Sequence, residues 1–213
     1  MEQRMEYALK YVDRGEDFWS NVIFCDERTF STDDNWVHKI REGSREAEQE
    51  SGRVTAGLFG WMSAACVGEL TDVGVGRFNG NKYVKILDEV LLPSVRGLLF
   101  PDATPFYLVQ DNILIHTSLA VRSWFHEHPE ITVLPHPPRS PDLNPIEHIW
   151  AAMTKKCDNY AIGRSGAAVV NSALRAWEEL RKPEEQARTQ SLVDSMSSRL
   201  NSVLDAAGGH TKY

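Results

Sequence analysis

Three acidic residues stand where a folded chain can bring their carboxylates together. Asp26 directly follows the apolar run Val22–Cys25. Asp111 comes shortly after the apolar run Phe106–Val109, and Glu147 falls in the first turn of a predicted helix. In an α/β fold the ends of adjacent strands lie about 5 Å apart, so two such aspartates can share a cation while a helical glutamate closes the site. An all-oxygen ligand set of this kind suits Mg²⁺ or Mn²⁺.

Two such ions would give the site a definite chemistry. Held about 4 Å apart, they can activate a water or hydroxyl and stabilise the leaving oxygen in an in-line phosphodiester displacement. Acids after strands and in first helical turns also serve as caps and as partners of the helix dipole. Position alone leaves both interpretations open, so the neighbouring residues have to decide between them.

The acids must be positioned by a series of strands and helices. Apolar periodicity predicts strands over residues 22–25, 35–40, 106–109 and 131–134, β structure over 54–70, and helices over 1–20, 83–91, 117–128, 165–182 and 185–206. Pro93 is expected to bend or end its helix. The polar stretch 42–53 lacks periodicity and is predicted to be a mobile loop. The alternation of elements predicts an α/β fold.

A proline-rich segment leads into the helix that carries Glu147. It contains five prolines, Pro135, Pro137, Pro138, Pro141 and Pro145, which together predict a fixed extended loop. Asn144 is expected to cap the helix that follows, with Pro145 at the first helical position and Glu147 at the third.

Composition limits the class of protein. Of 213 residues, 42% are hydrophobic and 25% are charged, which predicts a globular chain with a real core. An excess of 30 Asp and Glu over 23 Lys and Arg gives a net charge of −7, which opposes strong non-specific binding to DNA unless basic residues cluster. Without a signal peptide or a membrane-spanning stretch, we expect an intracellular protein that is not secreted and does not contact membranes.

Four segments carry a resemblance to a known family. Ser140–Trp150 has the sequence SPDLNPIEHIW, Val22–Phe30 is VIFCDERTF, and the pairs Asp111-Asn112 and His116-Thr117 stand between them. In this order they resemble the catalytic domain of mariner-like DDE transposases, and the 35 residues between Asp111 and Glu147 are close to that family's spacing. The resemblance extends from about residue 18 to the C-terminal Gly-Gly-His-Thr-Lys-Tyr.

The resemblance implies a fold and an activity. The fold would be an RNase H-like mixed β-sheet flanked by α-helices. Asp26, Asp111 and Glu147 would be the catalytic residues and would bind two Mg²⁺ or Mn²⁺ ions. Water would attack the phosphodiester at a transposon end, and the freed 3′-OH would then attack target DNA at a TA step. A nuclear location and homodimeric assembly are further implications.

Several polar and basic side chains near the motifs are candidate contacts to DNA. Arg139 lies in the proline-rich loop beside Glu147 and is the side chain most readily placed on a phosphate. Lys155 and Lys156 could also touch phosphate, although a solvated helix face is the alternative. The remaining two candidates are Asn112 and His116, for which a capping role is the alternative.

The departures from the family matter for function. We expect a single RNase H-like domain over residues 1–213, with a helical lead-in over 1–20 and C-terminal helices over 160–213. About 20 residues before Asp26 leave no room for the helix-turn-helix modules with which relatives read DNA ends, so a separate DNA-reading domain or partner is expected. The alternatives are a domesticated, non-catalytic module that binds DNA, chromatin or protein, and a nuclease acting on RNA/DNA hybrids. An intact acidic triad favours the enzyme, because a module freed from catalysis has no physical reason to keep three repelling carboxylates.

Overall fold

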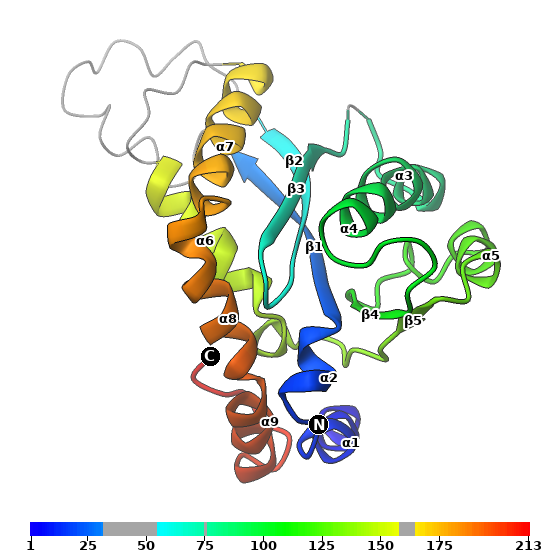
Figure 1. Ribbon diagram of the computed structural model, residues 1–213, viewed down its shortest axis with the longest axis vertical. Coiled ribbons are helices and arrows are strands. Elements are labelled where there is room, and N and C mark those ends of the chain that lie inside the picture. The colour runs from blue at the N-terminus through cyan, green and yellow to red at the C-terminus, as the bar shows by residue number, and fades with distance from the viewer. Residues whose placement is uncertain (32–54, 75, 158–164) are drawn as a thin grey trace.

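A five-stranded mixed sheet forms the centre of the computed structural model, which describes residues 1–31, 55–74, 76–157 and 165–213 (Figure 1). Its spatial order is β3-β2-β1-β4-β5. Strand β1 pairs antiparallel with β2 and parallel with β4, β2 pairs antiparallel with β3, and β4 pairs parallel with β5. The strands are β1 (Val22–Ser31), β2 (Thr55–Met62), β3 (Val67–Asp72), β4 (Phe106–Val109) and β5 (Ile131–Val133).

Helices cover both faces of the sheet. In Figure 1, α6 to α8 lie on one side of the strands and α3 to α5 on the other, while α1 lies beside α9. The helices are α1 (Glu2–Tyr11), α2 (Glu16–Ser20), α3 (Gly80–Ile86), α4 (Leu92–Leu98), α5 (Leu119–Glu127), α6 (Ile146–Cys157), α7 (Gly166–Leu180), α8 (Gln186–Asp194) and α9 (Met196–Asp205). In the described part of the chain, no helix has the length and apolar character needed to cross a bilayer.

Alternation along β1 divides its side chains between two cores. Phe24 and Phe30 lie in the core shared with α6 and α7, whereas Ile23 and Cys25 lie in the core shared with α3 to α5. Because successive side chains of a strand point to opposite faces, Asp26 and its successor Glu27 face different helical layers.

The structure corrects two predicted element ends. Strand β1 does not stop at Asp26 but continues to Ser31, because its second half pairs with β2. Pro93 does not end its helix: the helical run continues from α3 through a π-helical turn over Leu87–Leu91 into α4, which contains the proline. The irregular turn directly precedes Pro93, whose ring and missing N–H disturb a regular α-helix.

Other predicted elements are confirmed in outline or fall outside the described residues. The two predicted strands at 106–109 and 131–134 are β4 and β5, and the predicted helix 185–206 divides into α8 and α9. The predicted strand 35–40 and the predicted loop 42–53 lie outside the described residues.

A buried network around Asp142 holds the loop that leads into α6. Arg4 donates to both carboxylate oxygens of Asp142 at 2.8 and 2.7 Å, and the Thr211 hydroxyl donates to Oδ2 at 2.8 Å. Arg199 donates to the backbone carbonyl of Asp142 at 2.7 Å. Burial opposes ionisation of Asp142, but the hydrogen bonds from Arg4 and Thr211 outweigh it and lower the pKa. Segments near both ends of the chain therefore fasten the loop before Glu147.

Candidate active site

The two aspartates lie just beyond the segment in which β1 and β4 pair. In the parallel pair of β1 and β4, Phe24 is opposite Val109. Asp26 lies two residues beyond Phe24, and Asp111 lies two residues beyond Val109. Asp26 therefore lies within β1, whereas Asp111 lies just after the end of the neighbouring strand β4.

The pKa of Asp26 depends on the other acids around it. Its pKa is raised from 3.8 to about 7, first by burial and then by the negative charges of Glu147, Glu27 and Asp111. The indole N–H of Trp150 opposes this rise by donating to Asp26 Oδ2 at 3.0 Å. The other two predicted acids, Asp111 after β4 and Glu147 in α6, thus both act on the carboxyl group of Asp26 in β1, as does Glu27.

Glu147 is paired with a basic side chain of β1. Arg28 Nη1 lies 3.3 Å from Glu147 Oε2, and both side chains are more than a third exposed, so the pair contributes little to stability. Burial raises the pKa of Glu147, and Arg28 opposes that rise. Arg28 lies two residues after Asp26 on the same face of the strand, which puts a positive charge beside two of the acids.

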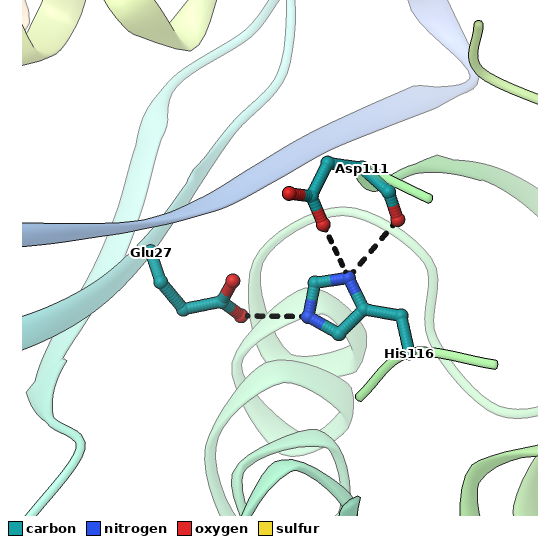
Figure 2. A group of neighbouring side chains, drawn as sticks. All are labelled: Glu27, Asp111 and His116. Atoms are coloured by element: carbon teal, nitrogen blue, oxygen red, sulfur yellow. Dashed lines mark hydrogen bonds and ion pairs between the residues drawn. The ribbon is translucent and has the colours of Figure 1, made fainter. Parts of the chain in front are cut away.

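Asp111 is held by His116, which in turn contacts Glu27 (Figure 2). His116 Nδ1 lies 2.6 Å from Asp111 Oδ1 and 3.0 Å from the Asp111 carbonyl, and Nε2 lies 3.2 Å from Glu27 Oε1. In Figure 2 the second carboxylate oxygen of Asp111 points away from the imidazole. Burial would lower the pKa of His116, but the hydrogen bonds to Asp111 and Glu27 outweigh it and raise the pKa to about 10. The two acids therefore favour the protonated form of the ring, in which both nitrogens donate.

The residues fit a divalent cation. Ligand atoms of Glu27, Asp111 and His116 lie within 4.8 Å of one another, which is compatible with a metal ion. Both imidazole nitrogens already face carboxylates at hydrogen-bonding distances, however, and so position these acids rather than offer a free ligand. Burial raises the pKa of Asp26 first, and the negative charges of Glu147, Glu27 and Asp111 raise it further. Carboxylate oxygens are the ligands that Mg²⁺ and Mn²⁺ prefer, and a cation at Asp26, Asp111 and Glu147 would offset these charges.

The predicted DNA contacts divide into two groups. Asn112, Arg139 and Lys155 are exposed, and Lys156 is half-buried in an ion pair with Glu185 at 3.2 Å. The prediction that His116 contacts phosphate is wrong, because its side chain is only 2% exposed and both ring nitrogens are engaged by acids.

Asn144 also differs from its predicted role as a cap. Its Nδ2 donates to the Cys25 carbonyl at 3.3 Å, and its Oδ1 accepts no hydrogen bond from the described residues. The first turn of α6 begins instead with backbone bonds, including Glu147 N to the Asn144 carbonyl at 3.2 Å. Asn144 therefore ties the start of α6 to β1 next to Asp26.

Trp150 contacts Asp26, Arg28 contacts Glu147 and Glu27 contacts His116, and the sequence alone predicts no role for these three residues. Strand alternation places Arg28 on the face of Asp26, and the helical repeat places Trp150 one turn after Glu147, so both carried a usable local signal. The contact between Glu27 and His116 spans 89 positions of the chain and had no such signal.

Comparisons with known proteins agree with this geometry. The sequence model described as DDE superfamily endonuclease matches residues 21–166. The chain is 31% identical to the Transposable element Tcb1 transposase of Caenorhabditis briggsae and 29% identical to the Transposable element Tc1 transposase of Caenorhabditis elegans, covering 99% of this chain and 77% of each relative. Its fold is similar to the crystal structure of the catalytic domain of Mos1 mariner transposase, with a TM-score of 0.76, 18% identity, and coverage of 99% of this chain and 95% of that chain.

Fold and site together define a phosphoryl-transfer domain built on an RNase H-like mixed sheet. The predicted fold class is confirmed by the likeness to the Mos1 catalytic domain. The chain belongs to the DDE superfamily endonuclease family and is a mariner-like transposase catalytic domain.

The raised pKa of Asp26 predicts a pH-dependent gain in stability on Asp26→Asn. Between its unfolded value of 3.8 and about 7, the folded chain holds a proton on Asp26 that the unfolded chain has lost. The free energy of unfolding therefore falls as pH rises through this range, and the penalty is complete above pH 7. In EDTA, thermal unfolding should show that Asp26→Asn raises Tm more at pH 8 than at pH 5. An equal difference in Tm at the two pH values would contradict the raised pKa.

Proposed function

We propose that this chain cleaves the phosphodiester at transposon ends and joins the freed 3′-OH to target DNA. In this proposal Asp26, Asp111 and Glu147 hold two Mg²⁺ or Mn²⁺ ions. The observation that carries it is the effect of the other two acids on Asp26: burial raises the pKa of Asp26 first, and the negative charges of Glu147, Glu27 and Asp111 raise it further. When bound, the ions supply activation of the attacking water or hydroxyl and stabilisation of the leaving oxygen.

The chain's own residues prepare the site. Burial and the neighbouring negative charges raise the pKa of Asp26 to about 7, and a bound cation would favour its ionised form. A cation bound to Glu147 would weaken the ion pair between Glu147 and Arg28. The half-exposed guanidinium of Arg28 could then bind a DNA phosphate. His116 holds one oxygen of Asp111 and leaves the other for a ligand.

The relatives support the substrate, the metals and the assembly. The curated relatives are transposases of transposable elements. Solved structures with the same fold include the Mos1 catalytic domain with Raltegravir and Mg or Mn, and a pre-cleavage Mos1 transpososome. We infer that this chain likewise binds DNA as a dimer, relies on a separate DNA-reading domain or partner, favours TA target steps and works in the nucleus.

The proposal is tested by DNA cleavage with the isolated chain. Supercoiled plasmid and a labelled duplex that carries an end of a matching element are incubated with Mg²⁺, Mn²⁺ or EDTA. We expect slow nicking in either metal and none in EDTA, with a free 3′-OH on the product. An RNA/DNA hybrid serves as the competing substrate. Metal-saturated protein that binds DNA without cutting it would leave the non-catalytic interaction module as the function, and preference for the hybrid would assign an RNase H-type nuclease.

A further inference from the structure

The indole of Trp150 holds the first of the three acids in place. We propose that Trp150 is a positioning residue that orients the Asp26 carboxylate for its cation, an inference that rests on the proposed metal role of Asp26. Its Nε1–H donates to Asp26 Oδ2 at 3.0 Å, and the side chain is fully buried. With Oδ2 committed to the indole, the orientation of Oδ1 is determined as well.

One helix thereby controls two acids. Glu147 lies in the first turn of α6, and Trp150 follows three residues later on the same helix. Residues three apart are neighbours on a helix surface, so any shift of α6 moves Glu147 and the donor to Asp26 together. The separation between the first and third acids is therefore set by one rigid element rather than by two independent side chains.

The sheet leaves room for this contact at a glycine. Gly60 is the cross-strand partner of Asp26 in the antiparallel pair of β1 and β2. A Cβ atom at position 60 would lie 2.7 Å from Cη2 of Trp177, closer than real Cβ atoms pack, and 3.0 Å from Cη2 of Trp150, which is a tight contact. The absence of a side chain at position 60 is what lets the two rings lie against the strand beside Asp26.

A second tryptophan lies beside the first one in the same core. The rings of Trp150 and Trp177 have centroids 4.9 Å apart, and Trp177 Nε1 donates to the Gly68 carbonyl at 2.8 Å. Both indoles are fully buried and each donates one hydrogen bond. They differ in the acceptor: a backbone carbonyl for Trp177 and a carboxylate of the proposed site for Trp150.

This difference separates a positioning role from ordinary core packing. Trp150→Phe and Trp177→Phe each remove one indole donor from the same core, so both should lower Tm to a similar extent. Only Trp150→Phe should change the metal site. In isothermal titration with Mn²⁺, we expect its Kd to rise about tenfold or more, as is typical when a group that orients a metal ligand is removed. Trp177→Phe should keep the Mn²⁺ affinity of the parent chain.

A second measurement keeps both tryptophans, so it does not depend on whether the Trp150→Phe variant folds. In the ¹⁵N-labelled chain, the indole N–H resonance that shifts on Asp26→Asn should also be the one that moves most when Mg²⁺ is added. Equal Mn²⁺ affinities for the two Phe variants, or an indole resonance that responds to Asp26→Asn and ignores Mg²⁺, would overturn the positioning role.

These outcomes stand apart from the test of the proposed function. A parent chain that binds Mn²⁺ and cuts DNA, with Trp150→Phe unchanged in both, removes only the role of Trp150. A parent chain that binds Mn²⁺ through Trp150-dependent geometry but cuts no DNA removes the proposed function and retains the positioning role.

Discussion

Nicking of DNA should fall at least about a thousandfold when any one of the three acids loses its charge, because each ligand acts as part of one unit. The variants are Asp26→Asn, Asp111→Asn and Glu147→Gln, which keep side-chain size. For the same reason, a pair of these substitutions should cost little more than one. Asp72→Asn is the matched control: Asp72 lies at the end of β3, where it accepts a hydrogen bond from Gly74 N at 2.8 Å, away from β4 and α6.

The same variants separate catalysis from folding. With metal present, Asp26→Asn is expected to be inactive. Without metal, the same variant is expected to be more stable than the parent chain at pH 8, because it lacks a carboxylate whose ionisation is opposed by burial and by neighbouring acids. Initial rates with saturating Mn²⁺ and Tm in EDTA are measured on the same preparations. Cleavage that survives Asp26→Asn or Glu147→Gln at a tenth of the parent rate would remove that acid from the proposed site.

The largest loss of stability is expected when the buried ion pair between Arg4 and Asp142 is broken on one side. Both side chains are less than a tenth exposed, and the pair is bidentate. Removing one partner leaves a buried charge without its counter-ion, so Arg4→Ala or Asp142→Ala should lower the free energy of unfolding by about 3–5 kcal/mol. The double variant should lose less than the sum of the two single variants.

Urea unfolding measures these losses, and an exposed pair is the control. Lys85 and Glu89 lie 3.7 Å apart on the surface of the helical run that begins with α3, so Lys85→Ala should leave the unfolding midpoint nearly unchanged. Because Asp142 lies in the loop before Glu147, Arg4→Ala should also slow nicking below its own melting range. If Arg4→Ala unfolds at the same urea concentration as Lys85→Ala, the network does not fasten the loop.

Local patterns predict most of the described elements in their order, and the resemblance to a known family points to the three acids. Short apolar runs predicted β4 and β5, and Asp26 and Asp111 lie just beyond the segment in which β1 and β4 pair. Proline and helix-start chemistry placed Glu147 in the first turn of α6. These signals extend over a few residues, so they can be recognised in the sequence.

Hydrogen-bond and strand-pairing partners that are distant in the chain could not be predicted in this way. The end of β1 was placed too early, because pairing with β2 carries the strand past Asp26. His116 was assigned to phosphate and Asn144 to a cap, whereas the fold gives His116 two acids and gives Asn144 the Cys25 carbonyl. In each case a hydrogen bond to a residue distant in the chain replaced the local use of the side chain.

The sequence by itself therefore determined which groups carry charge at the site, and the tertiary structure decided how those groups are held. The bond from Trp150 to Asp26 spans 124 positions, and it exists because Gly60, opposite Asp26, leaves space for the ring. Periodicity reports which face of an element is buried but not which atoms meet there. A buried donor takes the acceptor that packing brings within reach, and packing is settled only when the sheet and the helices close on one another.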